Sequence, residues 1–248
     1  DGGALLVAAG PELSGVESIA ETPLAPALPA VPTGAVTAAG YYPRLSDDGR
    51  RHPVTRTLPG GLNEPPDWGR WFRTVGVRDA QGDVVMRGAD NEPLLVLNRY
   101  GEGRVAMLLS DHGWLWARGF EGGGPHVSLY RRIAHWLMKE PSLEEEALRA
   151  TANGRTLVIE RQTMGDTTDP ATIELPSGES REVILSPAGD GLFLAELVLD
   201  QPGLVEVTSG DLRALAHVGA VDAPEFRATV STTDVIEPLS AESGGLTR

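Results

Sequence analysis

The pattern of apolar and polar positions changes near the middle of the chain. In the first part, continuous apolar runs at 4–9 and 105–110 are typical of strands buried in a sheet. Two further strands are predicted at 83–86 and 94–98, and the glycine-rich break at 122–125 precedes a helix whose apolar face packs on the sheet. That face is expected to consist of Val127, Tyr130, Ile133, Ala134 and Leu137.

Beyond the acidic run at 144–146, short strands recur at close intervals and are separated by Gly, Pro and Asp, a pattern typical of an antiparallel sandwich. The last of these predicted strands covers 226–231. We therefore expect an α/β domain over residues 1–147, a β-sandwich domain over 148–236 and a loosely held polar tail over 237–248.

The net charge of the chain restricts the classes of partner that it can bind. It has 248 residues, with 21 basic against 35 acidic side chains and a net charge of −14. That balance opposes attraction to nucleic-acid phosphates, so no nucleic-acid partner is expected. The chain has no cysteine, which excludes disulfides, thiolate metal sites and a cysteine nucleophile within these residues. No cofactor is predicted.

The densest group of candidate functional residues follows the strand at 105–110. Ligands of open α/β sheets bind where strands end at their carboxyl termini, and Asp111 and His112 come directly after this strand. An aspartate beside a histidine suits proton transfer, although neighbouring residues in extended chain point to opposite faces. The alternative is structural, with Asp111 bracing the loop and His112 lying on the surface.

The same segment contains residues that suit a planar or sugar ligand. Trp114, Trp116 and Arg118 combine ring stacking with cation–π attraction, and His126 lies at the start of the predicted helix. The alternative is that the two tryptophans close the edge of the core. No metal site is predicted, because His112 and His126 lack helical ligand spacing. The acidic run at 144–146 is interpreted as a solvated connector.

Five segments resemble a known group of proteins: residues 2–7, 52–55, 94–97, 101–106 and 110–112. They are similar to the glutamine-amidotransferase-like region of large, membrane-anchored bacterial envelope proteins. The resemblance covers residues 1 to about 140, and the tail is similar to segments that precede a membrane helix in such proteins. It implies a flavodoxin-like α/β domain, here N-terminally truncated, in an extracytoplasmic, periplasmic setting.

The resemblance also implies what is missing for catalysis. Catalytic class I amidotransferases use a cysteine and a His-x-Glu pair; His112 matches the histidine, but Trp114 stands in place of the glutamate. We therefore expect a non-catalytic interaction or structural protein, with an envelope protein or a glycan as partner. Two alternatives stay open: an amidohydrolase or amidotransferase whose nucleophile lies upstream, and a glycan-binding module using Trp114, Trp116 and Arg118.

Overall fold

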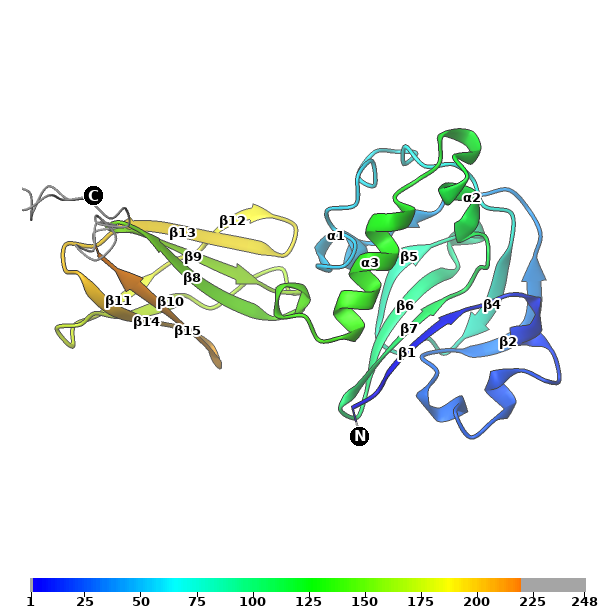
Figure 1. Cartoon of the computed structure of the whole chain (residues 1–248), viewed down its shortest axis with the longest axis horizontal. Helices are drawn as coiled ribbons and strands as arrows, with labels where there is room; N and C mark the ends of the chain where they lie inside the picture. Colours follow the sequence, from blue (N-terminus) through cyan, green and yellow to red (C-terminus); the bar gives the residue numbers. More distant parts are fainter. Residues whose placement is uncertain (1, 220–248) are drawn as a thin grey trace, which may run out of the picture.

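The computed structural model describes residues 2–219 of the chain. Its architecture is mixed α/β and rich in strands, with several antiparallel sheets. Figure 1 shows an α/β unit and a separate pair of sheets, joined by the segment that follows helix α3. The strand predicted at 226–231 and the tail at 237–248 lie outside the described residues.

A five-stranded sheet forms the centre of the α/β unit, in the order β1-β7-β6-β5-β3. Its strands are β1 (Ala4–Ala8), β3 (Arg44–Leu45), β5 (Asp83–Arg87), β6 (Pro93–Tyr100) and β7 (Gly103–Leu108). Every residue of β7 is buried, as its continuous apolar run predicts. The segment that follows β7 therefore begins at the end of a buried strand.

The expected flavodoxin-like sheet is not seen in the described residues. Such a sheet is parallel, whereas here only β1 and β7 pair in parallel, and β7-β6, β6-β5 and β5-β3 are antiparallel. For β5-β6 and β6-β7 the physical reason is the length of the connections. Short turns such as the one between β6 and β7 permit only antiparallel pairing, because a parallel pair needs a long crossover.

The two faces of this sheet are covered differently. Helix α3 (His126–Leu137) covers one face through Leu129, Ile133 and Trp136, and β2 (Val31–Thr37) with β4 (Thr74–Arg78) forms a small second sheet. Among the strands of this sheet, α3 packs against β7 and β1. The remaining helical segments are α1 (Asp47–Arg51), α2 (Gly113–Ala117) and the 3-10 turns η1 (Pro11–Ser14), η2 (Ile19–Glu21), η3 (Ala25–Ala27), η4 (Ala89–Asn91), η5 (Phe120–Gly122) and η6 (Pro141–Leu143).

The buried face of α3 differs from the predicted one. Ile133 and Leu137 are buried as expected, but Val127 is 73% exposed, and Leu129 and Trp136 take its place in the core. Positions 129, 133, 136 and 137 also follow helical spacing, so the sequence contains two overlapping stripes. The larger side chains, Leu129 and Trp136, decide which stripe faces the sheet.

Two four-stranded antiparallel sheets form the rest of the described chain. One has the order β11-β10-β14-β15 and the other β12-β13-β9-β8. Their strands are β8 (Ala147–Asn153), β9 (Thr156–Gln162), β10 (Ala171–Glu174), β11 (Ser180–Val183), β12 (Ser186–Gly189), β13 (Leu192–Val198), β14 (Gly203–Ser209) and β15 (Leu212–Val218). Both sheets contribute to one aliphatic core, with Leu157 and Ile159 from β9 against Ile173 and Val207. The architecture is that of a β-sandwich.

Candidate functional site

His112 and Asp111 lie at the end of β7, as predicted, but without catalytic geometry. Asp111 forms an ion pair of 2.7 Å with Arg73. The Nδ1 atom of His112 accepts a hydrogen bond of 3.1 Å from the backbone N–H of Phe72, and its Nε2 atom is 3.8 Å from Asp111. Burial, helped by the charge of Arg73, lowers the pKa of His112, which favours the neutral ring at pH 7.

Within residues 2–219, no hydroxyl group is hydrogen-bonded to the ring of His112. The hydroxyl of Ser110 is close in sequence, but it is fully buried and accepts a hydrogen bond of 3.2 Å from the backbone N–H of His112. The contacts of both residues are therefore those of a braced loop. Asp111 braces the loop as the structural alternative expects, but the side chain of His112 is largely buried rather than on the surface.

The predicted stacking residues do not share a surface. Trp116 is 3% exposed and packs against Trp71 and Trp68, with ring centroids 4.6 Å and 5.2 Å apart. Its indole N–H donates to the carbonyl of Gly69 at 2.8 Å. Trp114, in contrast, is 55% exposed, so the two rings cannot hold one sugar between them.

The other two candidates lie at or near the surface rather than in the core. Arg118 is exposed at the end of α2, and His126 is half-buried with its ring centroid 4.7 Å from the ring of Tyr130. The candidates are close together in the sequence. Because Trp116 is buried in the core, however, it is not available to a glycan, and the predicted binding surface lacks its central residue.

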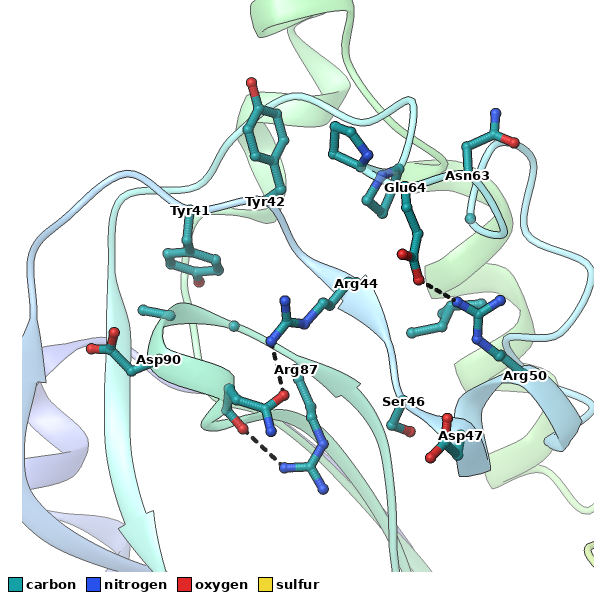
Figure 2. Close-up of a pocket in the computed structure, with 17 residues that line it drawn as sticks. Tyr41, Tyr42, Arg44, Ser46, Asp47, Arg50, Asn63, Glu64, Arg87 and Asp90 are labelled. Atoms are coloured by element: carbon teal, nitrogen blue, oxygen red, sulfur yellow. Dashed lines mark hydrogen bonds and ion pairs between the residues drawn. The ribbon is translucent and has the colours of Figure 1, made fainter.

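A cavity away from these residues lies in a groove beside the edge strand β3. Its volume is about 880 Å3, within the range usual for ligand sites. We call it the arginine groove, after the three arginines Arg44, Arg50 and Arg87 in its wall (Figure 2). Tyr42, which is 45% exposed, and the two prolines at 65 and 66 supply apolar surface.

The register of the sheet sets two of these arginines against each other. Arg44 on β3 and Arg87 on β5 are directly opposed in the antiparallel ladder, a position where like charges repel. Both donate to Asn91: Arg44 to the side-chain oxygen and Arg87 to the backbone carbonyl, each at 2.9 Å. Within residues 2–219 neither guanidinium has a carboxylate partner within ion-pair distance.

The loop that carries Asn91 is strained. Asp90 and Asn91 have positive φ angles of 50° and 64°, a left-handed conformation that is unfavourable for residues other than glycine, although Asp and Asn tolerate it best. Strain of this kind persists where surrounding contacts enforce it, and it occurs often at binding sites. Here it places the oxygens of Asn91 between the two guanidinium groups.

The third arginine of the groove is neutralised. Arg50 lies on α1 and contacts Glu64 at 3.2 Å (Figure 2). Asp47 and Asp90 also line the groove, so its charge is mixed at the margin. The unpaired positive charge is concentrated at Arg44 and Arg87.

A second group, the acid–histidine cluster, consists of His52, Asp83 and Glu145. One ligand atom from each lies within 4.8 Å of the others, next to a cavity of about 480 Å3 lined by Asp83 and Glu145. Glu145 is 8% exposed, so the acidic run at 144–146 is not the solvated connector predicted from the sequence. Its side chain turns inward because Trp136 and Arg99 donate hydrogen bonds to it.

This cluster suits a proton better than a metal ion. The backbone N–H of Val54 donates to Nδ1 of His52 at 3.1 Å, so the neutral ring carries its proton on Nε2. That Nε2 is fully buried and is 3.5 Å from Glu145 without hydrogen-bond geometry. A metal ion on Nε2 would move the proton to Nδ1, where it would face the N–H of Val54.

The two carboxylates of the cluster have opposite pKa shifts. Burial raises the pKa of Asp83, and the negative charge of Glu145 adds to the effect. Burial alone would raise the pKa of Glu145 as well, but the approach of His52 and hydrogen bonds from Arg99 and Trp136 hold it well below its usual range. Glu145 is therefore the ionised member, and Asp83 the one that burial disfavours as an anion.

Comparisons with known proteins give little help with function. No family model matches the chain, and no curated protein matches it. Two solved structures from Salmonella typhimurium, both named cytoplasmic proteins, are similar to part of it. One is 23% identical with a TM-score of 0.43 and covers 55% of this chain and 55% of that chain. The other, from strain LT2, is 19% identical with a TM-score of 0.42 and covers 55% and 56%. The chain thus spans about half the length of either, and likeness this weak transfers no function.

The expected periplasmic localisation is contradicted by these comparisons. Both similar structures are named cytoplasmic proteins, whereas the expectation depended only on the resemblance of short segments to envelope proteins. We therefore withdraw the periplasmic assignment. As a separate observation, none of the helices among residues 2–219 has the length and apolar character needed to cross a membrane.

Sequence reasoning missed both groups of residues described here. Arg44 and Arg87 are far apart in the chain, and only the pairing of β3 with β5 brings them together. His52, Asp83 and Glu145 come from three separate segments for the same reason. The one available signal was the segment at 87–91, where an arginine precedes Asp-Asn, residue types that favour turns with positive φ.

Proposed function

We propose that this chain is a non-catalytic interaction protein that binds an acidic polypeptide segment in the arginine groove. One observation carries the proposal: Arg44 and Arg87 are opposed in register, and neither has a carboxylate partner within the described residues. A carboxylate placed between them would relieve their repulsion. Guanidinium groups also bind carboxylates through two parallel hydrogen bonds, which supplies geometry as well as charge.

The apolar surface of the groove favours a polypeptide over a free inorganic anion. Tyr42 is largely exposed, and prolines 65 and 66 line the same cavity. Tyrosine and arginine are both enriched in protein interfaces. Tyrosine buries a large area with few rotatable bonds, and arginine supplies strong directional hydrogen-bond donors. The overall charge of −14 repels long acidic chains, so the expected partner has one or two carboxylates rather than an extended acidic tract.

The fold supports the non-catalytic part of the proposal only by resemblance. The observation behind this part is that β1 and β7 pair in parallel and that α3 packs on them. We propose that the unit is a divergent relative of amidotransferase-like domains that kept the scaffold without the chemistry. In support, the ring of His112 is hydrogen-bonded to the backbone of Phe72 rather than poised beside a nucleophile.

The test is a binding titration with a defined peptide pair. A fluorescein-labelled peptide with two glutamates among Leu, Pro and Ser residues is compared with its glutamine counterpart by fluorescence anisotropy. We expect saturable binding of the glutamate peptide and at least tenfold weaker binding of the glutamine peptide, a difference of about 1.4 kcal/mol. Arg44→Gln combined with Arg87→Gln is expected to weaken the glutamate peptide to the same level.

The matched control removes charge outside the groove. Arg118→Gln combined with Arg213→Gln changes the net charge by the same amount, at two exposed positions, and is expected to leave binding unchanged. Equal binding of both peptides, or an equal loss in the control double variant, would show that the groove does not recognise carboxylates and would refute the proposal.

A further inference from the structure

A third cavity lies at the junction between the α/β unit and the β-sandwich. Its volume is about 450 Å3, and it is lined by the loop after α1, by α3 and by η6. We call it the junction pocket. Its polar wall is strongly basic, with Arg56 from the loop and Arg131, Arg132 and His135 from α3. It is distinct from the arginine groove, with which it shares no lining residue.

The charge of this pocket is unusual for so acidic a chain. The protein has 35 acidic side chains and only 21 basic ones, yet three arginines meet here. Within the described part of the chain, none of Arg56, Arg131 and Arg132 has a carboxylate within ion-pair distance. Glu160 is the one acidic group that acts on Arg56, and it forms its own ion pair with Arg149 at 2.7 Å.

Burial and the neighbouring positive charges both oppose ionisation of two of these arginines. Burial lowers the pKa of Arg132, and the adjacent charge of Arg131 lowers it further. Burial likewise lowers the pKa of Arg56, and the charges of Arg149 and Arg132 add to the effect. Like charges held together in a partly buried wall destabilise the fold unless an anion neutralises them.

The hydrogen bonds of the arginines leave most of their donors free. Arg132 donates from Nη1 to the carbonyl of Pro53 at 2.9 Å, and Arg56 donates from Nη1 to the side chain of Gln162. These bonds hold the two guanidinium groups in place. Because each guanidinium has five N–H donors, several stay available to an anion in the pocket. Thr57 and Ser142 add hydroxyl donors in the wall.

We propose that the junction pocket binds the phosphate group of a small ligand, held by Arg56, Arg131 and Arg132 with His135 at the margin. A phosphate dianion has the charge and the number of acceptor oxygens to engage several guanidinium groups at once. The volume exceeds that of a phosphate group alone, so a small phosphomonoester also fits. Because the wall combines α3 with the loop after α1, a bound phosphate would tie these segments together and stabilise the folded chain.

The test measures binding of two phosphate sources by isothermal titration calorimetry at constant ionic strength. Inorganic phosphate and glycerol 3-phosphate are titrated in parallel, and tighter binding of one identifies a free phosphate or a phosphomonoester as the preferred ligand. We expect saturable binding of at least one, accompanied by a rise in Tm. Arg131→Gln combined with Arg132→Gln is expected to weaken binding at least tenfold.

Two further variants separate loss of the site from loss of the fold. Arg132 also holds Pro53, so the first double variant is supplemented by Arg131→Gln with His135→Gln, both exposed positions. This second variant is expected to fold normally and still to bind more weakly. Arg44→Gln with Arg87→Gln serves as the charge-matched control and is expected to leave phosphate binding unchanged.

The outcomes that overturn the phosphate site are specific. They are the absence of saturable binding for both ligands up to roughly 10 mM, or an unchanged affinity in Arg131→Gln with His135→Gln. Equal weakening in the arginine-groove variant would also overturn it, because net charge alone would then explain the binding. Since the peptide titration described above depends on other arginines, either proposal can fail without the other.

Discussion

The α/β unit and the β-sandwich differ in how much of their chain lies outside helices and strands. In the sandwich, strands alternate with short turns, and the core is almost wholly aliphatic. In the α/β unit, long irregular connections carry tryptophans, arginines and buried polar groups. All three cavities described above are lined by residues that precede Ala147, the first residue of β8. Binding chemistry therefore lies in the α/β unit, where side chains on β3, β5 and α3 meet residues from the connecting loops.

The largest expected effect tests whether the two units have separate cores. Trp116→Ala removes a buried indole and its hydrogen bond to Gly69, and we expect a loss of about 3–5 kcal/mol in the stability of the α/β unit. Val207→Ala in the sandwich core is expected to cost about 2 kcal/mol. Differential scanning calorimetry should show each variant shifting a different transition. A single transition shifted by both would mean that the two cores unfold cooperatively.

A smaller effect is expected from Gly49→Ala, which tests how tightly α1 packs on β5. A Cβ atom at position 49 would lie 1.9 Å from the carbonyl oxygen of Val85, so α1 must move away from the strand. We expect a loss of about 1–3 kcal/mol in urea unfolding, together with weaker peptide binding because Arg50 moves with α1. Gly3→Ala is the control, since a Cβ there meets nothing within 4 Å. Equal stability of the two variants would contradict this packing.

Glu145→Gln tests the buried carboxylate that ends the α/β unit. Glu145 is ionised and buried, with a pKa held below that of an unfolded chain, so its contribution is present above about pH 4 and is lost as the pH falls through the folded pKa. We expect a loss of about 2 kcal/mol at pH 7, and a smaller difference from the unmodified protein at pH 3. Urea unfolding at both pH values measures this. Glu140→Gln, at an exposed position, is the control; a difference that does not change with pH would argue against an ionised Glu145.

The smallest expected effect has the opposite sign. Burial raises the pKa of Asp83, so the ionised form destabilises the folded state, and this penalty develops as the pH rises above the unfolded value of about 3.9. Asp83→Asn is therefore expected to raise the stability at pH 7 by at most about 1 kcal/mol, or roughly 2–4 °C in Tm. The gain should disappear near pH 3. A loss of stability at pH 7 would show that the Asp83 carboxylate stabilises the folded state as a partner of His52, instead of destabilising it.

Local sequence patterns predicted part of the fold. The continuous apolar runs at β1 and β7 correspond to strands, and the glycine break at 122–125 is followed by α3. The buried face of α3 was predicted incorrectly, because the sequence contains two overlapping apolar stripes, one starting at Val127 and one at Leu129. Only the volume of Trp136 against the sheet distinguishes the two stripes. The local pattern does not give the mixed pairing of the sheet, because an apolar run has the same appearance in a parallel and in an antiparallel pair.

For the candidate sites, the sequence determined which chemical groups are present, and the tertiary structure determined which of them lie close together. The net charge, the absence of cysteine and the positions of the arginines can be read from the chain alone. Strand register decided that Arg44 faces Arg87, and the packing of α3 beside the loop after α1 decided that Arg132 lies near Arg56. Electrostatic interactions depend on distance and burial, which residues remote in sequence acquire only when the chain folds.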